Sequence, residues 1–92
     1  MYKLLIVDDE YEMHNGISKF FPWDSIGFTV VSHLDNGKKA YEYIQKNPVH
    51  IVLTDVNMPV MNGLELASLL CENYPDIYIV FFSGYSDFSF AQ

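Results

Sequence analysis

Three aspartates in this sequence directly follow short apolar runs. Asp8 and Asp9 follow residues 4–7, and Asp55 follows residues 51–54. If the two runs are neighbouring parallel strands, the three carboxylates lie close together beyond one edge of the sheet. Two such charges about 5 Å apart repel each other by about 3 kcal/mol at an effective dielectric constant near 20. A pocket of this kind must therefore hold either a proton or a cation.

The oxygen-only character of this cluster indicates which cation and which chemistry to expect. A few carboxylates completed by water suit Mg²⁺. Zinc is not expected, because no His or Cys lies near these strand ends at metal-ligand spacing. A metal beside one free carboxylate suits phosphoryl transfer, in which the carboxylate attacks phosphorus and becomes an aspartyl phosphate. Ser83, which follows the apolar run at 77–82, offers a hydroxyl to a phosphoryl oxygen.

Each of these residues also has a purely structural explanation. Asp8 or Asp9 alone is well explained as the N-cap of a helix that begins near Glu10, and Asp55 alone as a turn residue. Two acids after one strand, a third after another strand and a hydroxyl after a further strand instead favour a metal-dependent phosphoacceptor site. This interpretation requires that folding gathers the three carboxylates and that Asp55 is not buried away from solvent.

The segments between these residues alternate between strand and helix patterns. Strands are expected at residues 4–7, 28–31, 51–54 and 77–82. Helices are expected at residues 10–21, after an N-cap at Asn36, after a capping box formed by Asn62 and Glu65, and from Ser86 or Asp87 onward. Strands that alternate with helices predict one α/β domain with a doubly wound parallel sheet.

Composition excludes several classes of function. The 92 residues include twelve Asp and Glu against five Lys and no Arg, for a formal net charge of −7. A chain with this charge repels phosphate backbones, so we expect neither nucleic-acid nor membrane binding by this chain. The apolar start at residues 4–7 ends in acids and predicts a strand in place of a signal peptide. The run at 77–82 is too short to cross a bilayer.

The cysteine and the histidines receive structural interpretations. Cys71 is the only cysteine, which excludes an internal disulfide and fits a reducing cytoplasm. It falls in the helix expected after Asn62, and we expect it to fill space in the core. We expect surface or packing roles for the three histidines, which are His14, His33 and His50.

Several motifs, taken together, resemble a known family. Residues 6–10 (IVDDE), 55–59 (DVNMP), 62–66 (NGLEL) and 82–85 (FSGY) follow, in order and spacing, the receiver domain of bacterial two-component response regulators. The resemblance covers the whole chain. It implies a flavodoxin-like (CheY-like) sheet with strand order 2-1-3-4 and a cytoplasmic signalling protein that receives a phosphoryl group from a sensor histidine kinase.

The resemblance also implies a role for each matching position. Asp55 is the phosphoacceptor, Asp9 binds Mg²⁺ directly, and Asp8 binds it more indirectly, through water. The remaining matches are the backbone carbonyl of Asn57 as a further metal ligand, Ser83 as the switch hydroxyl, Tyr85 as a modulator of phosphate lifetime, and Met58, Pro59 and Gly63 as the loop that shapes the pocket floor.

A finer resemblance concerns the output of the signal. Residues 22–28 and 83–92 are similar to the subgroup whose receivers precede an AraC-type helix-turn-helix domain, in which phosphorylation controls transcription. The alternative is a receiver-like module that works through protein contacts without phosphorylation. Loss of one of the three acids would be expected in such a module, and all three are present.

Receivers also carry a fifth strand with a Lys followed by Pro, and then a last helix. The lysines of this chain lie elsewhere, at Lys3, Lys19, Lys38, Lys39 and Lys46. We therefore expect residues 1–92 to be a receiver domain that is incomplete at its C-terminus and lacks the phosphate-pairing lysine. Slow phosphorylation would follow. The fourth strand would be an unprotected edge, open to pairing with a second copy.

Overall fold

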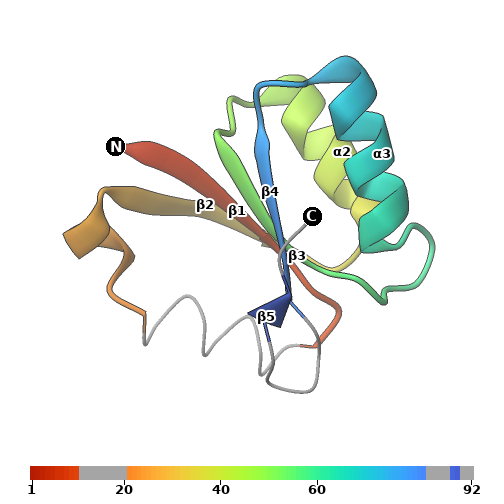
Figure 1. Cartoon of the computed structure of the whole chain (residues 1–92), viewed down its shortest axis with the longest axis horizontal. Coiled ribbons are helices and arrows are strands. Elements are labelled where there is room, and N and C mark those ends of the chain that lie inside the picture. Colours follow the sequence, from red (N-terminus) through yellow and green to blue (C-terminus); the bar gives the residue numbers. More distant parts are fainter. Residues whose placement is uncertain (11–20, 83–87, 90–92) are drawn as a thin grey trace.

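The computed structural model describes residues 1–10, 21–82 and 88–89, which form one sheet with two helices against one of its faces (Figure 1). The sheet has the order β2-β1-β3-β4-β5. Its strands are β1 (Tyr2–Val7), β2 (Phe28–Leu34), β3 (Ile51–Asp55), β4 (Tyr78–Phe82) and β5 (Phe88–Ser89). The first four strands are parallel to their neighbours, and β5 runs antiparallel to β4. The predicted α/β fold with parallel order 2-1-3-4 is confirmed.

Both helices begin at the capping residues that the sequence indicates. Helix α2 (Gly37–Lys46) follows Asn36, whose side chain accepts a hydrogen bond from the Lys39 amide. Helix α3 (Gly63–Asn73) follows Asn62, and the Asn62 and Glu65 side chains complete the predicted capping box. Such caps satisfy first-turn amides that have no partner within the helix.

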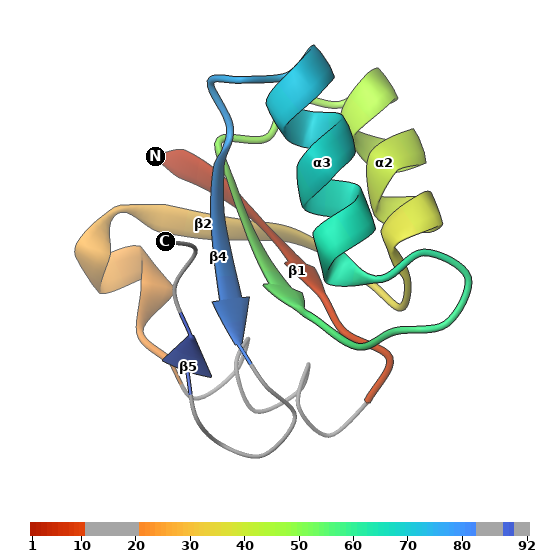
Figure 2. The ribbon, with the colours of Figure 1, turned by 45° about the vertical axis from the view of Figure 1, so that its right-hand side comes forward.

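Buried apolar side chains pack on both faces of the sheet. On one face, alternate residues of β1 and β3 pack against α2 and α3, with a buried core of Leu5, Val7, Ala40, Ile44, Val49, Val52, Leu66 and Leu70. The other face buries a smaller cluster of Leu4, Ile6, Leu53 and Phe82. The two views of Figures 1 and 2 show α2 and α3 side by side on one side of the sheet. The central strands β1 and β3 are thus buried on both faces, as their unbroken apolar runs predict.

Four sequence-based expectations need correction or fall outside the described residues. Residues 88–89 form a strand and not part of a helix, and they pair with Phe81 and Phe82, so the end of β4 is not an unprotected edge. Cys71 is exposed and does not fill the core. A short 3₁₀ helix, η1 (Trp23–Ile26), precedes β2 and was not predicted. The helix expected at 10–21 lies almost wholly outside the described residues. None of the helices in the described segments is long and apolar enough to cross a membrane.

Candidate metal and phosphoacceptor site

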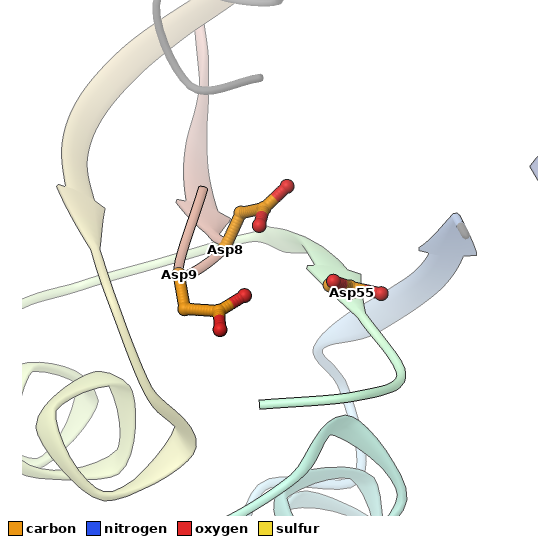
Figure 3. A group of neighbouring side chains, drawn as sticks. All are labelled: Asp8, Asp9 and Asp55. Atoms are coloured by element: carbon orange, nitrogen blue, oxygen red, sulfur yellow. The ribbon is translucent and has the colours of Figure 1, made fainter. Parts of the chain in front are cut away.

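The three aspartates meet beyond the carboxyl ends of two neighbouring strands. Strands β1 and β3 pair with Val7 opposite Thr54, so the next residues, Asp8 and Asp55, lie side by side. One carboxylate oxygen from each of Asp8, Asp9 and Asp55 lies within 4.8 Å of the others. Figure 3 shows the three side chains converging on one region from the ends of the two strands. The first condition for the site, that folding gathers the carboxylates, is confirmed.

Asp8 is fully buried, and its two oxygens have different surroundings. Oδ1 accepts a hydrogen bond of 2.8 Å from the Glu10 amide, and the helix that Asp8 was predicted to cap lies almost wholly outside the described residues. Oδ2 is buried without a hydrogen-bond partner among the described residues. Burial raises the pKa of Asp8 to about 6, with a smaller contribution from the nearby charge of Asp55. Oδ1 is thus held by the backbone, whereas Oδ2 is left for a proton or a cation.

Asp55 is also buried, with an exposed fraction of only 3 %. Burial raises the pKa of Asp55, and the charge of Asp9 adds to that shift, whereas hydrogen bonds from the Asn57 and Val56 amides oppose it. The Asn57 amide lies 3.3 Å from Asp55 Oδ1. The expectation that Asp55 reaches solvent is wrong for this structure. This burial counts against the phosphoacceptor interpretation, whereas the convergence of the three carboxylates supports it.

Asp9 completes the cluster from its open side. In contrast to Asp8 and Asp55, it is exposed, so an ion from solvent meets this carboxylate first. Three carboxylates, one of which carries a buried oxygen that has no partner in the described part of the chain, form the hard all-oxygen donor set that Mg²⁺ prefers. A bound cation would also remove the repulsion among the three charges. The residues present fit a magnesium ion.

The loop between β3 and α3, residues 56–62, carries the remaining predicted positions that the structure describes. Asn57 is exposed at the start of this loop, and Met58 is half-buried and packs against the core cluster under α2 and α3. Gly63 closes the loop, because its amide donates a 2.9 Å hydrogen bond to the Val56 carbonyl. A Cβ at position 63 would overlap the Asp55 carbonyl oxygen. Ser83 and Tyr85 lie outside the described residues.

Sequence reasoning missed one contact beside the site. The Gly37 amide at the start of α2 donates a 2.9 Å hydrogen bond to the Met61 carbonyl of the loop at 56–62. Gly37 and Met61 are 24 positions apart, and only the packing of α2 beside α3 brings them together. The available sequence signal was Gly37 itself, which directly follows the N-cap Asn36. Glycine is a poor helix former, so its presence in the first turn indicates that space is restricted there.

The fold and the acid cluster define an α/β domain with a carboxylate site at one edge of its parallel sheet, and comparison with known proteins gives the family. The family model of the response regulator receiver domain matches residues 4–92. The chain therefore belongs to the response regulator receiver domain family.

Individual relatives agree with this assignment. The chain is 38 % identical over 92 residues to the uncharacterized transcriptional regulatory protein YesN of Bacillus subtilis, covering all of this chain and 25 % of YesN. It is 37 % identical over 86 residues to the response regulator receiver protein CpdR of Brucella abortus, covering 94 % of this chain and 69 % of CpdR. The chain thus spans only a quarter of the length of YesN.

Solved structures show the same fold. The receiver domain of AraT, a response regulator from Geobacillus stearothermophilus, superimposes with a TM-score of 0.85 at 31 % identity, covering 91 % of this chain and 65 % of that one. A two-component transcriptional regulator AraC from Clostridium phytofermentans gives a TM-score of 0.83 at 37 % identity, covering 94 % of this chain and 69 % of that one.

Proposed function

We propose that this chain is the phosphoacceptor receiver of a two-component system, which takes a phosphoryl group from a sensor histidine kinase onto Asp55. The observation that carries the proposal is the convergence of the Asp8, Asp9 and Asp55 carboxylates within 4.8 Å at the carboxyl ends of β1 and β3. Membership of the receiver family supports it. The same family membership supports a cytoplasmic location.

The proposed reaction uses the three acids in different ways. Bound Mg²⁺ would neutralise the charge on the phosphoryl oxygens. Asp9 would hold the ion directly, Asp8 through water, and the Asn57 backbone carbonyl would add a ligand. A carboxylate oxygen of Asp55 attacks phosphorus while the bond from phosphorus to the donor's leaving group breaks, and the leaving group takes up a proton. The product is an aspartyl phosphate, with Ser83 as the proposed switch hydroxyl and Tyr85 and Met58 as modulators of its lifetime.

We further propose that phosphorylation controls a transcriptional output domain of the AraC type in the full-length protein. YesN is described as a transcriptional regulatory protein, and one solved relative as a two-component transcriptional regulator AraC. The chain's net charge of −7 disfavours contact with DNA, which supports a separate domain as the part that binds DNA. On this proposal residues 1–92 contribute the receiver, and self-association of receivers is one way to transmit the signal.

Phosphorylation by a small phosphodonor tests the proposal. The chain is incubated with acetyl phosphate and Mg²⁺, and intact mass spectrometry measures the fraction that gains one phosphoryl group. We expect slow labelling of the wild type, loss of labelling in Asp55→Asn, and loss with a chelator. Asp76→Asn is the matched control, because Asp76 is an exposed acid in the turn before β4, at the opposite end of the sheet from Asp55. Labelling that persists in Asp55→Asn or without metal would refute the proposal.

One observation favours a second candidate function. The 3 % exposed fraction of Asp55 suits a receiver-like module that acts through protein contacts without phosphorylation. The intact acid cluster argues against this candidate, because such a module has no need for three repelling carboxylates. A chain that binds Mg²⁺ but accepts no phosphoryl group, either from acetyl phosphate or from a phosphorylated histidine kinase, would establish the second function.

A further inference from the structure

The start of α2 is joined to the loop that follows Asp55. Gly37 is the first residue of α2, a position whose amide has no acceptor within its own helix. In this structure the Gly37 amide donates a 2.9 Å hydrogen bond to the carbonyl oxygen of Met61, in the loop at residues 56–62. Gly37 is buried. Figure 2 shows this loop running from the end of β3 past the start of α2 to the start of α3.

The contact leaves no room for a side chain at position 37. A Cβ atom there would lie 2.7 Å from the Met61 carbonyl oxygen, 2.9 Å from Met61 Cγ and 3.1 Å from Met61 Cβ. The Met61 side chain can rotate away, but its carbonyl oxygen belongs to the backbone. Any residue larger than glycine must therefore push the loop away from α2 or give up the hydrogen bond.

The loop is too tightly bonded to absorb such a displacement at Met61 alone. The Met61 amide donates a 2.7 Å hydrogen bond to the Pro59 carbonyl, across Val60 with a φ of 70°. This left-handed conformation is unfavourable for a β-branched residue, so the turn depends on its surroundings to hold it. At the loop's ends, the Gly63 amide bonds to the Val56 carbonyl and the Asn57 amide bonds to Asp55 Oδ1. A shift at Met61 is thus passed to Asn57 and the Asp55 carboxylate.

We propose that Gly37 is a positioning residue for the metal site: by holding the Met61 carbonyl against α2, it fixes the loop that carries Asn57 and orients Asp55. The effect on Mg²⁺ rests on the proposed function, whereas the joint between α2 and the loop is independent of it. Groups that orient metal ligands typically change metal affinity by about 10- to 100-fold when removed.

The first test uses the wild-type chain and amide hydrogen exchange by NMR. We expect the Gly37 amide to exchange at least about tenfold more slowly than the Lys38 amide, which also lacks an acceptor within the helix. We expect saturating Mg²⁺ to slow exchange at Gly37 further, because the ion orders the loop. Equal exchange at the two amides would overturn the joint, and exchange at Gly37 that ignores Mg²⁺ would overturn its link to the site.

The second test is the substitution Gly37→Ala, with Gln45→Ala as the control at an exposed position of α2. Alanine favours helix over glycine, so a merely structural role of position 37 in the helix predicts unchanged or better function. We expect Gly37→Ala to weaken Mg²⁺ binding by about tenfold in calorimetry, and to shift the amide resonances of residues 55–62 in the metal-free chain. Mg²⁺ affinity within twofold of the Gln45→Ala value would overturn the proposal.

These readouts separate the two proposals. If the wild-type chain binds no Mg²⁺, the proposed function fails, while Gly37 exchange and the metal-free resonance shifts still decide whether the joint exists. If Gly37→Ala does not fold, the two exchange measurements on the wild type decide the proposal without it.

Discussion

At the scale of single residues, the two carboxylate oxygens of Asp8 have different surroundings. Its Oδ1 is held by the Glu10 amide, which fixes the direction of the carboxylate. Its Oδ2 is buried and has no partner among the described residues, which costs free energy unless a proton or a cation compensates it. Without metal at neutral pH, the ionised Asp8 carboxylate therefore destabilises the folded chain relative to an uncharged side chain at the same position.

Replacing Asp8 by asparagine should stabilise the metal-free chain at neutral pH. The pKa of Asp8 rises from 3.8 to about 6 on folding, so between these values the folded chain binds more protons than the unfolded chain. Stability contributed by this group is present below pH 4 and is lost as the pH rises through 6. The shift of about two pKa units corresponds to about 3 kcal/mol at about 1.4 kcal/mol per unit, so we expect Asp8→Asn to raise the free energy of unfolding by about 3 kcal/mol near pH 7.

Urea denaturation in the presence of a chelator measures this difference. It should shrink toward zero near pH 4, where the wild-type Asp8 is protonated in the folded chain as well. Asp76→Asn, which also removes one negative charge but from an exposed turn, controls for net charge. An Asp8→Asn gain that is the same at both pH values, or is matched by Asp76→Asn, would contradict the prediction.

Magnesium binding should depend on pH through the same carboxylates. Protons and Mg²⁺ compete for Asp8, whose pKa is about 6, and for Asp55, whose pKa is also raised by burial. Below pH 6 we expect the apparent affinity to fall by about tenfold per pH unit for each proton displaced. Calorimetry in two buffers of different ionisation enthalpy, near pH 5 and pH 7, measures affinity and proton release together. Affinity that does not change between the two pH values would show that the ion binds elsewhere.

At the scale of helices and strands, the sequence predicted best where a local signal and the packing agree. Asn36 and the Asn62–Glu65 pair cap their helices as expected, because capping depends on a few neighbouring residues. The unbroken apolar runs of β1 and β3 predicted central strands, and the order of strands then placed Asp8 near Asp55. Local rules placed the acids at the carboxyl ends of two strands, and the resemblance to the receiver family supplied the strand order that makes these strands neighbours.

Predictions failed where the outcome depends on contacts distant in sequence. Whether Asp55 is open or buried depends on the packing around it, which no local pattern encodes. Residues 88–89 pair with Phe81 and Phe82, and this tertiary pairing prevails over a local helix signal at Ser86 or Asp87. Cys71 directly follows the buried Leu70 on α3, and the orientation of α3 in the packed molecule leaves Cys71 exposed. The same limit hid the contact between Gly37 and Met61.

The start of α3 should tolerate no side chain at Gly63. A Cβ there would overlap the Asp55 carbonyl oxygen and press on the Val56 Cα, both of which are backbone atoms. We expect Gly63→Ala to lower the free energy of unfolding by about 2–3 kcal/mol, typical of forced overpacking. Leu64→Ala is the control, because Leu64 is 58 % exposed on the same turn and should change stability by less than about 0.5 kcal/mol. Equal urea midpoints for the two variants would refute the predicted overlap.

At the scale of the whole molecule, the three-aspartate cluster is a local concentration of negative charge in a chain that carries a net negative charge. The net charge is −7, so any added salt screens repulsion and stabilises the fold to some degree. The specific effect of Mg²⁺ must therefore be separated from screening. The chain allows this separation, because Asp9 lies in the cluster, whereas Asp76 is an exposed acid at the other end of the sheet.

Mg²⁺ should stabilise the folded chain beyond what ionic strength explains. An ion that binds only the folded state at about 100 times its dissociation constant adds about 2.7 kcal/mol, which raises the unfolding midpoint of a domain this size by roughly 10 °C or more. Thermal denaturation is compared in MgCl₂ and in NaCl of equal ionic strength. The excess stabilisation by Mg²⁺ should persist in Asp76→Asn and vanish in Asp9→Asn, although both variants lose one negative charge. An excess retained by Asp9→Asn would mean that general charge neutralisation, and not the three-aspartate cluster, explains the effect of the ion.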